Sequence, residues 1–333
     1  MTFKEKDIRD PDILKKYFEL VAKDSEKILV QKDSFEMIDQ TNWGLGKSVP
    51  EFEKSGYVYE RCLDTGTLFV NPRPKFDLLM NFYSLSESST YWVNDFFLPK
   101  IDVRREKIFK PRAKYISSKF TDNLPAMRIG DIGAGFGLFI EELQKINNYN
   151  LNLEAIEPSK DMAALCREKG ILVNENMLEN LVGKIEKYDL LTSFELFEHL
   201  HDPLVFLKDC YELLNPGGFI FLTTLNGHGF DIQVLWEESN SIFPPHHLNF
   251  FNPISMDKIM SSVGFDNIEI TTPGELDIDI VHNAYKNRKS NIPRFLSSLY
   301  SYSSDDVLIN FQKFIQDNNL SSHMRVMAQK PSE

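Results

Sequence analysis

The sequence predicts an α/β fold, an open seven-stranded sheet with helices on both of its faces. From residue 127 onward, short runs rich in β-branched and aromatic residues alternate with stretches whose apolar residues recur at helical spacing. Such alternation implies parallel strands joined by helical crossovers. The first of these strands leads directly into a glycine-rich turn and a helix, and the 333 residues of the chain suffice for a large core. Together these three observations predict the fold class.

The elements of this sheet can be placed along the chain. Strands are expected at residues 127–132, 151–157, 171–174, 188–194, 218–224, 266–272 and 323–329. Helices are expected between them at residues 137–147, 159–169, 203–214 and 253–263. The long gap before the last strand contains further helical patterns at residues 278–289, 293–301 and 304–317. We expect this helical insertion, at about residues 275–320, to form a cap near the substrate.

The first 112 residues are expected to form an extension of the α/β domain, which occupies residues 113–333. Residues 1–40 are charged and carry apolar residues at helical spacing. Residues 56–71 contain two β-rich runs around a central glycine, a pattern typical of a hairpin. A helical pattern interrupted by prolines continues from residue 76 to residue 119. The extension is therefore expected to combine helices with one hairpin.

Composition and charge narrow the function classes. A hydrophobic content of 42% and a charged content of 26% are ordinary for a soluble globular protein. No apolar run approaches the roughly 18–20 residues that span a bilayer, and the charged N-terminus lacks a signal-peptide core. With three scattered cysteines and no disulfide framework, we expect a cytoplasmic protein without a membrane span. The net charge of −12 argues against a nucleic-acid partner.

One stretch of the chain is nevertheless strongly basic. Between residues 100 and 119 there are eight bases and only two acids, which suits a small anionic ligand better than a nucleic-acid duplex. The bases are Lys100, Arg104, Arg105, Lys107, Lys110, Arg112, Lys114 and Lys119. The alternative is a solvated helix face on which these side chains bind no ligand.

The glycine-rich turn carries the strongest signal for a ligand. Gly133, Gly135 and Gly137 have G-x-G-x-G spacing, and glycine lets a ligand approach the backbone closely. A dinucleotide fingerprint would require glycine or alanine directly after Gly137, where the chain has leucine. Asp131 lies at the end of the first strand. Glu157 ends the second strand, where a carboxylate can accept hydrogen bonds from ribose hydroxyls.

Four motifs, in this order, resemble those of the class I S-adenosylmethionine (SAM)-dependent methyltransferases. Asp-Ile-Gly-Ala-Gly-Phe-Gly (131–137) is similar to the first motif of that family, and Ile-Glu-Pro-Ser (156–159) to its ribose-binding segment. Tyr-Asp-Leu-Leu-Thr-Ser-Phe-Glu-Leu-Phe-Glu-His-Leu-His-Asp-Pro (188–203) resembles the fourth strand and the loop after it. Leu-Leu-Asn-Pro-Gly-Gly-Phe (213–219) resembles the turn into the fifth strand. The resemblance covers about residues 113–273 and the final strand, and it implies a Rossmann-like sheet that binds SAM.

The same resemblance implies roles for single residues. Gly133, Gly135 and Asp131 would shape the site around the methionine end of SAM, and Glu157 would hold the ribose. Met177 and Leu178, just past the third strand, would pack on the adenine. Phe194 would contribute its backbone near the methionine amino group. The family usually offers a polar side chain to the adenine amine near residue 177, and this chain offers none there.

The loop after the fourth strand contains the candidates for the chemistry. His199 is the candidate general base, with Glu198 beside it, because a histidine pKa of about 6.5 suits proton transfer near neutrality. Glu195, Glu198 and His199 have E-x-x-E-H spacing, and with His247 they could hold Mg²⁺ or Mn²⁺ and lower the pKa of a bound hydroxyl. This arrangement is similar to that of the small-RNA 2′-O-methyltransferases and the quinone O-methyltransferases. Alternatively, Glu198 caps the loop, Glu195 touches the cofactor and the histidines are packing groups.

The extension carries a second resemblance. Residues 61–74 resemble the zinc-ribbon segment C-x-x-C-G…N-P-R-P that precedes the catalytic domain of bacterial sugar C-methyltransferases and related surface-glycan methyltransferases. Thr65 stands where the second cysteine would be, so we expect a degenerate hairpin that holds no zinc. The resemblance implies a deoxysugar or nucleotide-sugar acceptor, with the basic stretch at residues 100–119 available for its phosphates.

The sequence therefore predicts a SAM-dependent methyltransferase that O-methylates a sugar, a nucleotide-sugar or a similar small polar metabolite. Three alternatives remain open at this point: C-methylation of a nucleotide-sugar, 2′-O-methylation of RNA, and a SAM-binding protein without catalysis. A dehydrogenase is a more distant fourth. The sequence predicts neither the identity of the acceptor nor the oligomeric state.

Overall fold

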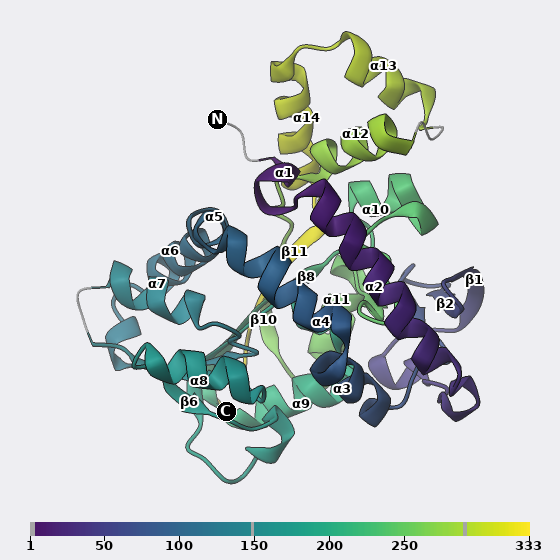
Figure 1. The fold of residues 1–333 in the computed structure, drawn as a ribbon. Helices are drawn as coiled ribbons and strands as arrows, with labels where there is room; N and C mark the ends of the chain where they lie inside the picture. The colour runs from purple at the N-terminus through teal and green to yellow at the C-terminus, as the bar shows by residue number, and fades with distance from the viewer. Residues whose placement is uncertain (1–3, 148–149, 289–291) are drawn as a thin grey trace. The chain divides into compact units, whose positions relative to one another are not determined.

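The computed structural model of the chain describes residues 4–147, 150–288 and 292–333. It contains a seven-stranded sheet with the strand order β10-β11-β8-β7-β4-β5-β6. Figure 1 shows the fold, with β8, β10 and β11 labelled among the helices. The strands are β4 (Arg128–Ile132), β5 (Asn152–Ile156), β6 (Leu172–Asn174), β7 (Tyr188–Phe194), β8 (Leu214–Leu225), β10 (Asp266–Thr271) and β11 (His323–Gln329). Strands β4 to β8 pair in parallel. The predicted α/β class and the predicted seven strands are confirmed.

The strand bounds agree closely with the predictions, and the largest difference lies at β8. This strand begins at Leu214, whereas the Asn-Pro-Gly-Gly turn signal placed its start at residue 218. The register between β7 and β8 shifts between Tyr188 and Leu190. The residues of the Asn-Pro-Gly-Gly turn signal therefore form an irregularity within β8 and do not separate it from the preceding helix.

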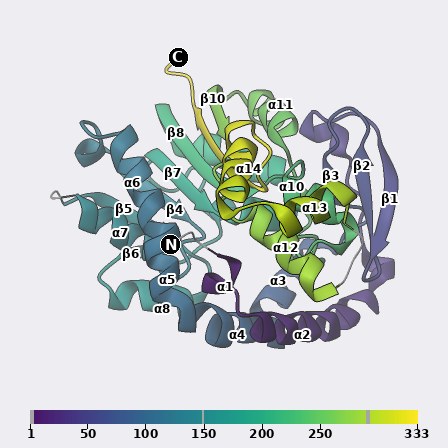
Figure 2. The same cartoon turned by 90° about the horizontal axis from the view of Figure 1, so that it is seen from above.

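Helices connect the parallel strands, as expected. The connecting helices are α7 (Leu138–Ile146), α8 (Lys160–Glu168) and α9 (Pro203–Leu213), whereas α6 (Lys110–Lys119) precedes β4 and α11 (Pro253–Val263) precedes β10. Because the chain steps from β4 to β6 in one direction and from β7 to β8 in the other, right-handed crossovers put α7 and α8 on one face and α9 on the opposite face. Figure 2 shows α6, α7 and α8 gathered beside β4, β5 and β6. Ile116, Phe139, Leu143, Leu190 and Phe221 belong to the buried core of this face.

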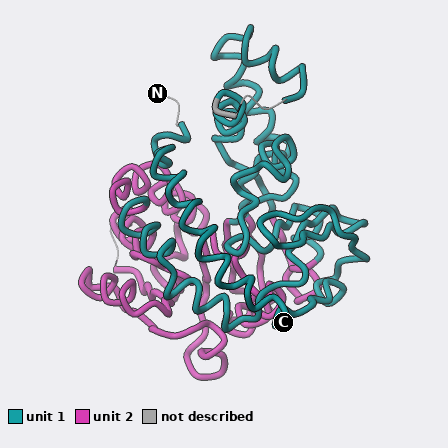
Figure 3. Tube along the Cα trace, turned by 45° about the vertical axis from the view of Figure 1, so that its right-hand side comes forward, with its two compact units in different colours: residues 1–96, 224–258, 270–325 teal, residues 97–223, 259–269, 326–333 magenta. Residues whose placement is uncertain are grey.

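The chain divides into two compact units, which Figure 3 draws in teal and magenta. The N-terminal unit comprises residues 1–96, 224–258 and 270–325, and the sheet unit comprises residues 97–223, 259–269 and 326–333. Each unit is assembled from three segments, so neither corresponds to a single cut in the chain. The predicted division after residue 112 stays a prediction about domain organisation.

The N-terminal unit contains a four-stranded antiparallel sheet with the order β1-β2-β3-β9. Its strands are β1 (Ser48–Lys54), β2 (Tyr57–Cys62), β3 (Leu68–Val70) and β9 (Asn249–Phe250). The predicted hairpin is confirmed as β2 and β3. The flanking strands were not predicted, because β1 contains Pro50 and alternating charges and β9 has only two residues. Tyr57, Tyr59 and Phe250 are fully buried in the core beside this sheet.

The remaining helices of the extension also follow the predicted pattern. They are α1 (Glu5–Ile8), α2 (Pro11–Leu29), α3 (Phe76–Leu85), α4 (Glu87–Tyr91) and α5 (Ile101–Arg104), with π-helical turns η3 (Trp92–Phe97) and η5 (Arg105–Phe109) around α5. Asp10 caps α2 by accepting hydrogen bonds from the backbone N–H groups of Asp12 and Ile13, and Pro11 stands at the first helical position. These local signals explain where the longest helix of the extension begins.

The insertion before the last strand is helical, as predicted. It contains α12 (Asp277–Arg288), α13 (Arg294–Tyr302) and α14 (Asp305–Asp317), and the predicted first helix ended on a residue outside the described ones. The Asp277 carboxylate anchors the insertion by accepting hydrogen bonds from Ser321 Oγ, Ser322 N and Gln312 Nε2. Its role as a substrate cap stays a prediction. Within the described ranges, no helix is long and apolar enough to cross a membrane.

Candidate cofactor and active site

The glycine turn at residues 133–137 joins β4 to α7 in the sheet unit. Gly135 has φ +54°, and a Cβ added there would meet no atom of the described residues within 4 Å. A Cβ at Gly137, which has φ +69°, would lie 2.5 Å from Ile171 Cδ1. Gly137 is therefore required by the packing of the turn. Gly135 borders open space, and the turn that contains it is where a ligand is predicted.

Glu157 holds this turn in place from the end of β5. Its side chain is 7% exposed, its Oε2 accepts a hydrogen bond from Gly135 N at 2.8 Å, and its Oε1 accepts one from Ser159 N at 2.9 Å. Burial raises the pKa of Glu157 although both backbone N–H groups act to lower it. A carboxylate offers about four acceptor positions, so both oxygens can still accept hydrogen bonds from a ligand.

Asp131 is a buried carboxylate at the end of β4. It is 3% exposed, and its Oδ1 accepts a hydrogen bond from Thr192 Oγ1 at 2.7 Å. Burial raises the pKa of Asp131 to about 7, against the lowering effects of Thr192 and of the Arg112 charge, while the Glu157 charge raises it further. A carboxylate in this state would gain from a cationic ligand group, since an opposite charge favours its ionised form.

Glu195 follows β7 directly and has an unusual backbone conformation. Its φ is +51°, a strained value for a residue other than glycine. Its Oε1 accepts hydrogen bonds from Arg112 Nη2 at 2.6 Å and from Thr223 Oγ1 at 2.6 Å, and its backbone N donates to Thr223 O at 3.0 Å. These three bonds stabilise the start of the loop in a single conformation.

Arg112 is a site residue whose role the sequence analysis missed. Its guanidinium lies 4.8 Å from the centre of the Phe194 ring, and burial lowers the pKa of Arg112 against the charges of Glu195, Asp131 and Glu198. In the sequence, Arg112 stands out only as one member of the basic stretch at residues 100–119. The partner of Arg112 lies 83 residues away in the sequence, and no local pattern signals such a pair.

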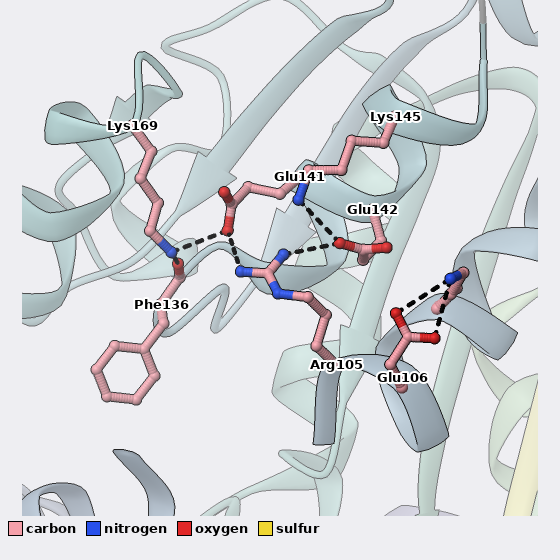
Figure 4. Close-up of polar contacts among 8 residues, drawn as sticks. Arg105, Glu106, Phe136, Glu141, Glu142, Lys145 and Lys169 are labelled. Atoms are coloured by element: carbon pink, nitrogen blue, oxygen red, sulfur yellow. Dashed lines mark hydrogen bonds and ion pairs between the residues drawn. The ribbon is translucent and has the colours of Figure 1, made fainter. Parts of the chain in front are cut away.

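The basic stretch is largely occupied by contacts within the protein. Arg105 donates to Glu141 and Glu142 (Figure 4), and Lys110 donates to Glu106. Other members pair as Arg112 with Glu195 and Lys119 with Glu269, and the Arg104 guanidinium lies over the Phe97 ring. The expectation that this stretch serves the phosphates of a ligand therefore loses its main support.

Glu198 and His199 lie together in the 3₁₀ turn η8 (Phe197–His199). Glu198 is 2% exposed, His199 is half-buried, and their ligand atoms lie within 4.8 Å of each other. Such a pair can transfer a proton or contribute two ligands to a metal ion. The sequence placed both residues in this loop.

His247 belongs to the N-terminal unit, whereas Glu195, Glu198 and His199 belong to the sheet unit. Its Nδ1 lies 2.6 Å from Ser241 O, so Nδ1 carries the proton and Nε2 the lone pair. Its backbone oxygen accepts a hydrogen bond from Tyr59 OH at 3.1 Å. Convergence of His247 with the other three predicted ligands stays a prediction.

The residues predicted for the adenine and the methionine end lie at strand ends of the sheet unit. Met177 is half-buried and Leu178, which begins the turn η7 (Leu178–Asn180), is buried. The Phe194 ring packs on Phe139 and Phe221 at centroid distances of 4.6 and 5.8 Å. The side chain of Phe194 thus serves the core and leaves its backbone for the predicted role, and all three cofactor contacts stay predictions.

Comparison with known proteins gives the family. Residues 104–270, half of the chain, match the family described as a methyltransferase domain. The chain belongs to this methyltransferase family. The SAM-dependent methyltransferase that the four motifs predicted is thereby confirmed at the level of the family. The matched segment contains the glycine turn, Glu157 and the loop with His199.

The curated relatives match this methyltransferase only in part. The ubiquinone biosynthesis O-methyltransferase of Parvibaculum lavamentivorans is 34% identical over 113 residues, which are 32% of this chain and 45% of that protein. The protein of the same name from Dinoroseobacter shibae is 29% identical over 152 residues, 43% of this chain and 61% of the relative. The chain thus spans about half the length of the curated relatives it matches.

Solved structures of other methyltransferases are more distant. A SAM-dependent methyltransferase from Thermotoga maritima, described as a possible histamine N-methyltransferase, has a TM-score of 0.46 and 18% identity and covers 72% of this chain and 96% of its own. A SAM-dependent methyltransferase from Archaeoglobus fulgidus has the same TM-score and identity and covers 70% of this chain and 100% of its own. These overlaps are too weak to bear on the acceptor.

The first prediction concerns Glu157. Glu157→Gln should weaken SAM binding about 10- to 100-fold, because an amide cannot accept from both Gly135 N and Ser159 N and loses the charged acceptor for the ribose. Isothermal titration calorimetry measures this affinity. Glu154→Gln is the matched control: Glu154 lies on the same strand, where it accepts from Arg128 and Tyr188, so its loss should lower the melting temperature and leave SAM affinity unchanged. Equal affinities of the wild type and Glu157→Gln would contradict the assignment.

The second prediction is a pH dependence. Because the raised pKa of Asp131 is about 7, its carboxylate becomes charged as the pH rises through 7 in the free protein. The affinity for SAM, whose ammonium group is cationic, should therefore increase between about pH 6 and pH 7.5, below the range in which an α-amino group deprotonates. Asp131→Asn should bind more weakly and lose this dependence. An unchanged pH profile in Asp131→Asn would show that another group titrates.

Proposed function

We propose that this protein transfers the methyl group of SAM to a hydroxyl oxygen of a small-molecule acceptor. The observation that carries this proposal is the turn at Gly135, which borders open space and is held by Glu157 beside the buried carboxylate of Asp131. An acceptor for ribose hydroxyls and a counter-charge for an ammonium group suit the two polar ends of SAM. When bound, SAM supplies a methyl group activated by its sulfonium for an in-line displacement.

His199 and Glu198 supply the proton chemistry in this proposal. His199 is half-buried in the loop after β7, and it would take the proton of the acceptor hydroxyl as the oxygen attacks. Glu198 is 2% exposed and lies within 4.8 Å of His199, so its carboxylate would orient the ring and stabilise the imidazolium. Arg112 would stabilise the conformation of this loop through its hydrogen bond to Glu195.

We propose further that Glu198, His199 and His247 hold Mg²⁺ or Mn²⁺. The carboxylate suits both ions, and the two imidazoles favour Mn²⁺ over Mg²⁺, which prefers oxygen ligands. A ring nitrogen fixed on a backbone oxygen, as in His247 with Ser241, is typical of metal-binding histidines. The ion would lower the pKa of the acceptor hydroxyl, so that its proton could pass to water, and His199 would then act as a ligand in place of its role as the base. The Oε1 atom of Glu195, the fourth predicted ligand, already accepts hydrogen bonds from Arg112 and Thr223. Glu195 would therefore stabilise the loop without binding the ion.

Two observations bear on the class of the methyl acceptor: the names of the matched relatives and the resemblance of residues 61–74. The matched relatives carry the name of O-methyltransferases in ubiquinone biosynthesis, which favours a hydroxyl on a quinone precursor. A sugar hydroxyl is the second candidate, favoured by the resemblance of residues 61–74 to the ribbon of sugar methyltransferases. The O-methyltransferase names count against C-methylation, and the net charge of −12 counts against RNA. A cytoplasmic location stays a prediction from the sequence.

The third prediction tests the acceptor and the metal together. The full chain is incubated with SAM and a panel of phenolic quinone precursors and sugar nucleotides, and mass spectrometry detects products heavier by one CH₂. We expect an O-methylated product whose formation stops in EDTA and resumes with Mn²⁺ or Mg²⁺. Glu198→Ala should lose turnover and metal dependence together, whereas Glu212→Ala, at an exposed position on α9, should behave as the wild type.

The same assay separates the alternatives. Full activity in EDTA, with His199→Ala inactive, would overturn the metal and leave general-base catalysis. Product from only one panel would decide between the quinone-precursor and sugar acceptors. No product from either panel, despite SAM binding, would contradict a small hydroxyl acceptor of both proposed classes.

A further inference from the structure

Phe136, in the middle of the glycine turn, and the preceding Gly135 are held by three neighbours within the sheet unit. Its ring stacks on Phe97 at a centroid distance of 5.0 Å and an interplanar angle of 23°. Its backbone oxygen accepts a hydrogen bond from Lys169 Nζ at 2.6 Å, and the preceding oxygen, of Gly135, accepts one from Cys166 Sγ at 3.2 Å. Both peptide planes after Gly135 are thus oriented by the end of α8.

Lys169 is the end of a chain of charges that begins on η5. Its ammonium lies 3.0 Å from Glu141 Oε2, and the same carboxylate oxygen accepts from Arg105 Nη2 at 2.9 Å (Figure 4). Burial alone would raise the pKa of Glu141, but the hydrogen bonds from Arg105 and Lys169 outweigh it and lower that pKa. Glu141 is therefore ionised at neutral pH and bridges the two cations.

A second route also leads from this helical segment to Phe136. Arg104, the neighbour of Arg105, is 8% exposed and lies 4.8 Å from the centre of the Phe97 ring. Phe97 in turn covers the ring of Phe136. Two adjacent arginines are thus connected to Phe136 by independent routes. Arg104 is connected to the ring of Phe136 through Phe97, and Arg105 is connected to the carbonyl oxygen of Phe136 through Glu141 and Lys169.

We propose that Lys169 is a positioning residue for SAM, and that residues 97–109 form a clasp that holds the turn in its binding conformation. The proposal rests on the proposed binding of SAM at Gly135. The ammonium of Lys169 keeps the carbonyl of Phe136 directed toward α8, which keeps the opposite side of the turn available to the ligand. Without it, the peptide after Phe136 can rotate, and SAM must reorder the turn on binding.

The fourth prediction follows from this proposal. Lys169→Met should weaken SAM binding about tenfold, as expected for one lost charged hydrogen bond, with a melting temperature within about 2 °C of the wild type. Lys169→Arg should restore most of the affinity, because a guanidinium can donate to the same oxygen. The matched control is Lys145→Met, which removes a lysine that pairs with Glu142 in the same charge network, and it should leave the affinity unchanged. Phe97→Leu should weaken binding severalfold through the second route.

Hydrogen exchange gives a readout that does not depend on ligand. In Lys169→Met the amides of residues 135–137 should exchange faster than in the wild type, with exchange in α7 unchanged. Equal SAM affinity of Lys169→Met and the wild type would overturn the positioning role and leave the proposed function intact. If the wild type binds no SAM, the proposed function fails, and unchanged exchange in the turn would overturn the clasp separately. An equal loss of SAM affinity in Lys145→Met would show that the effect comes from the change in net charge, and it would overturn the positioning role of Lys169.

Discussion

Strands β4 to β8 run parallel, so their carboxyl ends lie on one edge of the sheet, and the candidate residues of the sheet unit lie at or just beyond these ends. Asp131 pairs with Ala155 on one side and with Thr192 on the other. A slip of one residue in either register would turn Asp131 to the opposite face of the sheet. The bond from Gly135 N to Glu157 then links the turn after β4 to the end of β5. The positions of the site residues are therefore determined first by the register of the parallel strands, and only then by the conformation of the loops.

At this edge of the sheet, the interacting carboxylates outnumber the positive charges near them. Arg112, whose side chain is 12% exposed, interacts with Glu195, Asp131 and Glu198, and Asp131 also experiences the charge of Glu157. Several carboxylates thus share one guanidinium, and burial raises the pKa of Asp131 to about 7 despite the lowering effect of that charge. A cationic ligand relieves this imbalance. SAM is such a ligand, and so is a divalent metal ion beside Glu198.

The sequence predicted much of this architecture because periodicity reports on local structure. The bounds of β7, β11 and α11 agree with the prediction residue for residue. The glycine turn and Glu157 were identified from motif spacing alone. The pairs Arg112 with Glu195 and Lys169 with Phe136 were not, since they join residues 83 and 33 positions apart whose meeting depends on tertiary packing. A phosphate-binding role of the basic stretch stays a prediction, and the pairing of Arg105, Arg112 and Lys119 with carboxylates on other elements could not be predicted for the same reason.

The central claim is that the turn around Gly135 binds SAM, and a calorimetric titration of the full chain tests it most directly. The account predicts one SAM per chain with an affinity in roughly the micromolar range. It also predicts no binding to Gly135→Val, because the added methyl groups would occupy the open space beside the turn, at a backbone conformation that valine tolerates poorly. Circular dichroism establishes that the variant is folded. Unchanged SAM affinity in a folded Gly135→Val variant would contradict the account.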